Sequence, residues 1–308
     1  MAKKLINDEK VIAIVGTTRS PVSMALLPVT QEAEVTMISM ASSSSIVEPV
    51  AERKWVFKTA QNNAHTAPWQ VKYAKDKGLT KVANFYVNNA YGEDGAKAVV
   101  ASAEAEGLEI VLEETFGASD TDMTAQLTKL KASDAQALLV TAIPPAAAIL
   151  TKQFREMGVD MPIIHNHGVG MMPFISLCGE EVAEGVLFPM GKMVAVDALA
   201  DDDPQKPVLT KFVEEYEAST GNPASTFAGH GWDALQLSIK ALETLPDGLS
   251  LKEQREQFRD ALEGIQGMPG TSGVFNLSAT DHVGMSHNDV VMARIRNGQW
   301  EYYPPEKW

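Results

Sequence analysis

Short apolar runs rich in β-branched residues alternate with helical stretches along most of the chain. The run from Val11 to Val15 ends in small polar residues, and so does the run from Val35 to Met40. Such runs are typical of parallel strands that helices cover on both faces. Further strands are predicted at 55–58, 82–87, 110–116, 137–141, 161–164 and 185–188. Strands and helices in alternation predict an α/β fold with doubly wound parallel sheets.

The helical stretches carry residues that are typical of helix ends. Ser20-Pro21 predicts an N-cap serine followed by proline at the first helical position. Gly107, Gly158 and Gly221 fit C-terminal caps, because glycine adopts the left-handed backbone of such caps without strain. These boundaries support the alternation of strands and helices.

The last third of the chain departs from this alternation. The pattern from 204 to 263 is mainly helical, and Ser250 is predicted to cap its last helix. Two strands are predicted at 290–295 and 299–303, joined by a hairpin turn at Asn297-Gly298. We therefore expect an antiparallel pair at the end of the chain.

Length and charge restrict the class of protein. A chain of 308 residues exceeds what one hydrophobic core usually supports, so two lobes are expected. The 26 basic and 40 acidic side chains give a net charge of −14, which excludes an electrostatic footprint for nucleic acid. The only cysteine, Cys178, has no partner for an internal disulfide and leaves the redox compartment open. No apolar run approaches the ~20 residues of a membrane span.

The chain lacks the short motifs of common enzyme and cofactor sites. His167-Gly-Val-Gly170 resembles the start of a dinucleotide fingerprint, but Pro173 stands in place of the third glycine. His165 and His167 follow a strand with no cysteine or carboxylate at ligand spacing, so no metal site is expected. We expect no cofactor and no catalytic residues. His230 and His282 are isolated and are predicted to be structural histidines with satisfied hydrogen bonds.

Hydroxyl side chains gather where the first two strands end. Ser20 follows the first strand, and the run Ser42 to Ser45 follows the second. Open α/β sheets bind ligands at the carboxyl ends of their strands. The N-terminus of a helix offers amides and a positive dipole end, which suit a carboxylate. The sequence therefore predicts an acid-binding role for these residues, in addition to the helix-capping role of Ser20.

At these residues the chain resembles the periplasmic binding proteins of ABC importers, of the branched-chain amino acid type. The resemblance runs from about residue 3 to 167 and more loosely to 295. It rests on Gly16-x-x-x-Ser20, Met37-Ile-Ser-Met-Ala41-x-Ser43, Ala90-Tyr91-Gly92, Gly273-Val-Phe-Asn and Asp281-His282-x-Gly284. It implies two α/β lobes of the type I fold, a periplasmic location and a membrane permease as partner. Hinge closure on a small ligand is the implied mechanism.

The resemblance also implies lobe boundaries. The N-terminal lobe is expected at 1–60 plus 191–272, and the C-terminal lobe at 61–190 plus 273–308. Crossing segments are expected near 58–62, 188–192 and 270–275. Family members begin with a signal peptide and a β-α-β unit, and Met1 falls in the helix after that unit. About 30 or more residues are thus expected to be absent, which would remove a central strand and expose a sheet edge.

The family holds the α-carboxylate of its ligand with a loop serine, backbone groups at an alanine, and a hydroxyl two residues later. The resemblance places these groups at Ser20, Ala41 and Ser43, and the aromatic lid at Tyr91. The acidic positions that bind the ligand ammonium hold Asn62 and His167 here, and a second aromatic position holds Ile143.

The loss of acidic groups changes the expected ligand. A buried ammonium without a counter-charge costs several kcal/mol. We therefore expect a small organic carboxylate with a hydrophobic or aromatic body rather than an α-amino acid. Three alternatives stay open: a branched-chain or other amino acid as ligand, a cytoplasmic ligand-sensing regulator of the same fold, and an enzyme with His167 and Asp233 as acid and base.

Overall fold

The computed structural model describes residues 1–308 as two compact units. Unit 1 comprises Met1–Asn62 and Leu199–Asp289, and unit 2 comprises Asn63–Ala198 and Val290–Trp308. The chain therefore passes between the units three times. No helix combines the length and the apolar character that crossing a membrane requires.

Unit 1 is built on a parallel sheet whose three strands follow one another in sequence order. The strands are β1 (Ala13–Val15), β2 (Thr36–Ser39) and β3 (Val56–Lys58). The helices are α1 (Ala2–Asn7), α2 (Ser20–Glu32), α9 (Lys206–Thr220), α10 (Thr226–Leu242) and α11 (Leu251–Glu263), and β9 (Met268–Pro269) pairs with β10 (Val274–Phe275). Because β1 to β3 are parallel, their carboxyl ends lie at one edge of the sheet, where the loops that follow them meet.

Unit 2 holds a sheet of seven strands in the order β12-β11-β8-β7-β6-β4-β5. The strands are β4 (Lys81–Val87), β5 (Glu109–Phe116), β6 (Ala137–Thr141), β7 (Ile163–His165), β8 (Leu187–Gly191), β11 (Val290–Arg296) and β12 (Gln299–Tyr302). The strands from β4 to β8 are parallel, and β11 runs antiparallel to β8 and β12. The direction of strand order reverses between β4 and β6, which makes the loops after these two strands a topological switch point.

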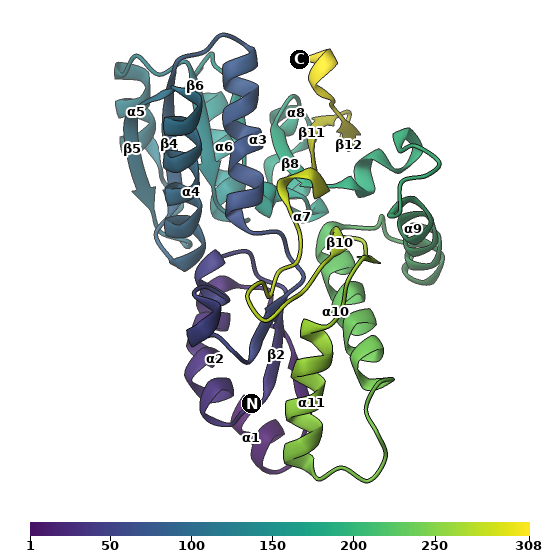
Figure 1. Ribbon diagram of the computed structural model, residues 1–308. Helices are drawn as coiled ribbons and strands as arrows, with labels where there is room; N and C mark the ends of the chain where they lie inside the picture. The colour runs from purple at the N-terminus through teal and green to yellow at the C-terminus, as the bar shows by residue number, and fades with distance from the viewer. The chain divides into compact units, whose positions relative to one another are not determined.

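Helices cover both faces of this larger sheet. They are α3 (Asn63–Asp76), α4 (Ala90–Glu106), α5 (Thr124–Ala132), α6 (Ala146–Glu156), α7 (Met172–Cys178) and α8 (Glu180–Ala183). Alternate residues of β6 enter different cores: Leu139 packs with α3 and α4, whereas Leu138 and Val140 pack with α5, α6 and α7. In Figure 1, α3 and α4 run along the same face of the sheet. The continuous apolar run of β6 is therefore explained by burial on both faces.

The sequence predicts several element ends correctly. Ser250 forms a capping box with Glu253 at the start of α11, and Gly107 and Gly221 end α4 and α9 with left-handed backbone. Asn297-Gly298 joins β11 to β12 with positive φ at both residues, as a two-residue hairpin of type I′ requires. The expected doubly wound α/β architecture with an antiparallel pair at the end is confirmed.

Two lobe boundaries differ from those expected. Residues 192–198 form a 3-10 turn that packs on β8, β11 and β12, so they group with unit 2. Residues 273–289 group with unit 1, because this segment returns along β3. The Lys58 amide donates to the His282 carbonyl at 3.0 Å. Only the first crossing, at Asn62, lies where the sequence places it.

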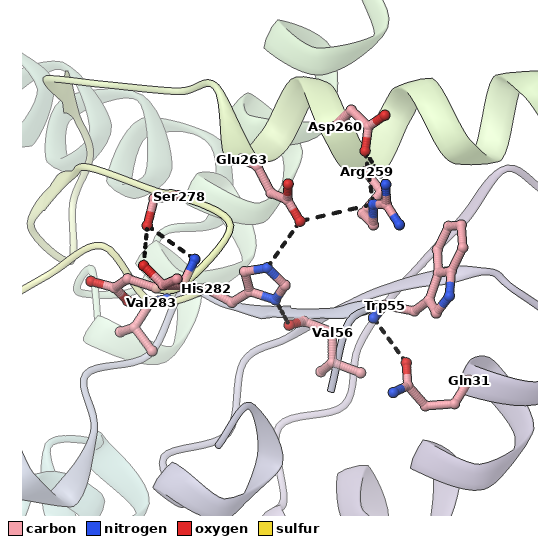
Figure 2. Close-up of polar contacts among 11 residues, drawn as sticks. Gln31, Trp55, Val56, Arg259, Asp260, Glu263, Ser278, His282 and Val283 are labelled. Atoms are coloured by element: carbon pink, nitrogen blue, oxygen red, sulfur yellow. Dashed lines mark hydrogen bonds and ion pairs between the residues drawn. The ribbon is translucent and has the colours of Figure 1, made fainter. Parts of the chain in front are cut away.

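His282 fixes this returning segment to the sheet of unit 1 (Figure 2). Its ring Nδ1 lies 2.8 Å from the Val56 carbonyl oxygen, and its Nε2 lies 3.3 Å from Glu263. The ring also stacks on Phe57 with 4.0 Å between centroids. Burial lowers the pKa of His282, whereas the Val56 carbonyl and the Glu263 carboxylate act in the opposite direction, because both partners accept hydrogen bonds and together they require a proton on each ring nitrogen. The prediction of a structural histidine with satisfied hydrogen bonds is confirmed.

Candidate functional site

The three residues predicted to bind a carboxylate lie together in unit 1. Ser20 follows β1, whereas Ala41 and Ser43 follow β2, and all three are buried. The Ser43 amide donates to the Ser20 hydroxyl oxygen at 3.2 Å, and the Ala41 amide donates to Ser39 at 3.2 Å. The carboxyl ends of two adjacent strands therefore supply one compact group of hydroxyls and amides.

Ser20 does not occupy the N-cap position that the sequence predicts. Arg19 has the extended backbone of the N-cap, and Ser20 is the first residue of α2. The amides of Val22 and Ser23 both donate to the Arg19 carbonyl at 3.0 Å, and Pro21 has no amide hydrogen. The first turn of α2 thus has few free amides that could bind an anion. The helix N-terminus therefore contributes less to carboxylate binding than the sequence predicts.

A buried lysine joins this group, and the sequence prediction missed it. Lys58 ends β3 with its side chain fully buried. Its ammonium donates to the Ser43 carbonyl at 3.0 Å and to the side-chain oxygen of Asn62. Lys58 lies at the carboxyl end of β3, and the loops with Ser20 and Ser43 lie at the carboxyl ends of β1 and β2. The position of Lys58 directly after the apolar pair Val56-Phe57 is therefore the sequence signal that could have identified this residue.

The three predicted residues of unit 2 also lie together. Tyr91 follows β4, Ile143 follows β6, and His167 follows β7. A methyl group added at Gly168 would lie 2.6 Å from the Tyr91 hydroxyl oxygen and 2.8 Å from a methyl carbon of Ile143. The rings of Tyr91 and His167 are 6.2 Å apart and nearly perpendicular. The cluster therefore forms at the strand-order switch between β4 and β6, where open α/β sheets bind ligands.

Asn166 holds His167 in place from the neighbouring position. Its side-chain oxygen accepts from the His167 amide at 2.6 Å and contacts ring Nδ1 of the same residue. The same oxygen accepts from the Thr66 hydroxyl at 2.9 Å, and the Asn166 amide group donates to Asn63 at 3.2 Å. The orientation of the imidazole is therefore set by a buried network of neutral side chains.

The unit 2 cluster contains a carboxylate that the sequence prediction did not weigh. Asp94 lies one helical turn after Tyr91 in α4. Its carboxylate accepts from the Asn63 side chain at 2.8 Å, and the same side chain donates to the Tyr91 carbonyl at 3.1 Å. An acidic group is thus linked to Tyr91 through the side chain of Asn63. In the sequence, the spacing of three residues between Tyr91 and Asp94 on one helix predicts that the two lie close together.

Burial dominates the behaviour of the Tyr91 hydroxyl. Desolvation raises the pKa of Tyr91 well above its usual range, and the nearby Gly168 amide acts in the opposite direction. The hydroxyl oxygen completes no hydrogen bond in the structure. Tyr91 therefore stays neutral, and its hydroxyl hydrogen has no acceptor in the structure.

A family model described as periplasmic binding protein matches residues 1–299. The chain belongs to the periplasmic binding protein family. The two α/β units have the fold expected for this family.

Solved structures and one curated relative show how close the similarity is. An extracellular ligand-binding receptor from Rhodopseudomonas palustris HaA2 superposes with a TM-score of 0.91 at 29% identity, covering 98% of this chain and 84% of that one. The branched-chain amino acid transporter substrate binding protein LivJ from Streptococcus pneumoniae, in complex with isoleucine, gives a TM-score of 0.81 at 25% identity, covering 97% and 81%. A leucine-, isoleucine-, valine-, threonine- and alanine-binding protein from Pseudomonas aeruginosa is 24% identical over 79% of this chain. The chain spans 62% of the length of that relative.

Asp233 in this periplasmic binding protein has a structural position. It is fully buried in α10, and its carboxylate accepts from the Thr271 amide at 2.7 Å, the Thr271 hydroxyl at 3.0 Å and the Ser272 amide at 2.8 Å. Burial raises the pKa of Asp233 to about 6, against the opposing effect of these hydrogen bonds. Because both oxygens fix the 271–272 turn, Asp233 is poorly placed to act as the acid or base of an enzyme.

His230 contradicts the prediction of a satisfied structural histidine. The side chain is buried in α10, one turn before Asp233, and neither ring nitrogen has a hydrogen-bond partner. Burial and the nearby Lys58 charge lower the pKa of His230 to about 3. An imidazole that is isolated in sequence can be satisfied or unsatisfied in the fold, and only the coordinates distinguish the two.

Proposed function

We propose that this chain is the ligand-binding component of an ABC importer and that it binds a small organic carboxylate with a hydrophobic or aromatic body. In this proposal the protein acts in the periplasm, closes its two units on the ligand, and presents the closed form to a membrane permease. Membership of the family supports the receptor role. The finer assignment of the ligand rests on the chemistry of the two clusters.

The buried Lys58 ammonium is the observation that carries the proposed ligand class. It lies 3.0 Å from the Ser43 carbonyl oxygen, beside the hydroxyls that the family resemblance assigns to a carboxylate. A cation held among hydroxyl and amide groups attracts a carboxylate, and charge-assisted hydrogen bonds are about twice as strong as neutral ones. In this proposal Ser20, Ala41 and Ser43 orient the carboxylate and Lys58 supplies the opposite charge, while Asn62 is a neutral polar group beside them.

Unit 2 supplies the contacts for the rest of the ligand. Ile143 offers an apolar surface, and Tyr91 offers an aromatic ring whose hydroxyl completes no hydrogen bond. His167 adds an imidazole of fixed orientation. Apolar and aromatic groups with a few placed polar atoms are typical of sites for small organic molecules. An aromatic acid such as benzoate, phenylacetate or cinnamate matches this set.

A second candidate ligand is an α-amino acid, and Asp94 is the observation that favours it. Asp94 places a carboxylate next to Tyr91, where it could balance an ammonium group. The relatives from Streptococcus pneumoniae and Pseudomonas aeruginosa are named for branched-chain and related amino acids. We place this candidate second because the positions that bind the ligand ammonium in the family hold Asn62 and His167 here, and neither is a carboxylate.

Isothermal titration of the whole chain tests the proposal. The titrants are benzoate, phenylacetate and cinnamate on one side, and leucine and valine on the other. We expect micromolar or tighter binding of at least one aromatic acid. Tight binding of leucine without a response to any aromatic acid would replace the proposed ligand class by the second candidate.

A further inference from the structure

One buried side chain of unit 1, His230, makes no hydrogen bond in the fold and takes no part in the proposed carboxylate contacts. His230 is 3% exposed, and both of its ring nitrogens lack a hydrogen-bond partner. A buried polar atom without a partner typically costs about 1–3 kcal/mol of stability. His230 carries two such atoms in one side chain, which is the largest unsatisfied polar group of unit 1.

His230 borders the loops that hold the predicted carboxylate-binding residues. The Thr59 hydroxyl donates to the His230 carbonyl at 2.9 Å, which fixes this part of α10 to the end of β3. The neighbouring Gly231 lies against Met40, directly before Ala41. The Lys58 charge is close enough to affect the titration of the ring. Lys58 in turn contacts the Ser43 carbonyl, so His230 and the acid-binding group share one neighbourhood.

The charge state of the ring restricts what it can bind. Because burial and Lys58 both disfavour protonation, the imidazole is neutral and has one N–H donor and one acceptor nitrogen. A carboxylate accepts hydrogen bonds only, so it can satisfy the donor nitrogen and leaves the acceptor nitrogen unpaired. A hydroxyl group supplies the missing hydrogen. A keto group does not, because it also only accepts.

We propose that His230 contacts the ligand directly and selects acids that carry a hydroxyl group. This inference rests on the proposed function, since it refines the class of carboxylate to hydroxy acids. The acceptor nitrogen of His230 takes the hydroxyl hydrogen, and the N–H donates to a ligand oxygen. Both unpartnered ring nitrogens of His230 would thereby be hydrogen-bonded to the ligand.

Matched pairs of acids test this selection in the wild-type chain. The pairs are 4-hydroxybenzoate with benzoate, and 3-phenyllactate with 3-phenylpropanoate, which place the hydroxyl on the ring or beside the carboxylate. Titration calorimetry should show at least about tenfold tighter binding of the hydroxy acid in one pair, as a new hydrogen-bonded pair predicts.

Two substitutions separate a ligand contact from a structural role. His230→Leu removes both nitrogens at similar volume, so the preference for the hydroxy acid should disappear while the unliganded melting temperature stays equal or rises. His230→Gln keeps one donor and one acceptor and should retain part of the preference. Leu235→Ala, at an exposed position of the same helix, is the matched control and should leave the preference unchanged.

The outcomes distinguish this inference from the proposed function. If the wild-type chain binds acids without a hydroxyl preference, or if His230→Leu keeps that preference, the role of His230 is refuted and the carboxylate proposal stands. A drop of more than about 5 °C in the unliganded melting temperature of His230→Leu assigns the residue to the fold and also refutes the role. If no acid binds the wild type, both proposals fail.

Discussion

The two clusters are built in the same way but differ in charge. In unit 1, loops after three consecutive parallel strands gather hydroxyls around the buried cation Lys58. In unit 2, loops after β4, β6 and β7 gather two rings and Ile143 around a network of neutral amides, with the carboxylate of Asp94 at its edge. Parallel strand ends thus provide the positions in both units, and the side chains at those positions set the charge of each cluster.

Under the proposed function, this difference in charge gives the two units different tasks. In that proposal the positive group of unit 1 binds the carboxylate of an acid, and the mostly neutral cluster of unit 2 contacts the rest of the ligand. Removing the cation should therefore lower the affinity for every acid by a similar factor. Substitutions in unit 2 should change the affinity by a factor that depends on the shape of the ligand.

The largest effect is expected from Lys58→Met. Loss of the ammonium leaves a carboxylate beside the Ser43 and Asn62 oxygens without an opposite charge, so the affinity for acids should fall by about 100-fold or more. Titration calorimetry with the tightest acid measures this loss. Lys54→Met removes an exposed lysine near β3 and should leave the affinity within about twofold. Equal affinities of Lys58→Met and wild type would show that the Lys58 charge does not contribute to the binding of acids.

A second buried charge of unit 1 predicts how stability changes with pH. Burial raises the pKa of Asp233 from 3.8 to about 6, so the folded state prefers the protonated form. Its contribution to stability is fully present below about pH 4 and is lost as pH rises through 6. The difference in unfolding free energy between wild type and Asp233→Asn should change by up to about 3 kcal/mol between pH 4 and pH 7. Urea unfolding at both pH values measures it, and a constant difference would show that Asp233 titrates normally.

Gly168→Ala should disrupt the close packing around Tyr91 in unit 2, because the site has no room for a methyl group. The added methyl group would meet the Tyr91 hydroxyl at 2.6 Å and the Ala142 carbonyl oxygen at 2.9 Å. Overpacking of this kind costs about 1–3 kcal/mol and should displace Tyr91, which weakens the binding of bulky acids more than that of small ones. Gly231→Ala, whose added methyl group meets only Met40 at 3.8 Å, should be neutral or stabilising. Equal effects of both substitutions on melting temperature would contradict the packing described here.

The smallest effect is expected from Tyr91→Phe. The hydroxyl is buried without a completed hydrogen bond, so its removal should leave the unliganded protein as stable as wild type or slightly more stable. Acids without a second polar group should bind both proteins within about threefold. Thermal unfolding and titration check these two expectations. A stability loss of more than about 2 kcal/mol would show that the hydroxyl is bonded in the fold.

Strand ends could be located from the sequence because burial on both faces leaves a continuous apolar run. That pattern predicts that Ser20 and Ser43 lie near each other, whereas the grouping of Tyr91 with His167 is what the family resemblance implies. The limits of local pattern show at Ser20, which is the first residue of α2 although Pro21 follows it, while Arg19 takes the capping position. A shift of one residue changed which amides remain for a ligand.

Long-range contacts could not be read from the sequence. A lysine at a strand end is usually solvated, and only the coordinates show that Lys58 is buried between the Ser43 and Asn62 oxygens. The return of residues 273–289 to unit 1 depends on the contact between Lys58 and His282, which are 224 positions apart in the printed sequence. Whether His230 finds a partner is likewise decided by its surroundings in space.

The most direct test of the central claim compares one carbon skeleton with and without an amino group. Titration of the whole chain with 3-phenylpropanoate and with phenylalanine changes only the α-amino group of the ligand. The account predicts at least about tenfold tighter binding of 3-phenylpropanoate, because Asn62 and His167 offer no counter-charge to an ammonium. Tighter binding of phenylalanine by the same factor would contradict it and would assign the ammonium to Asp94.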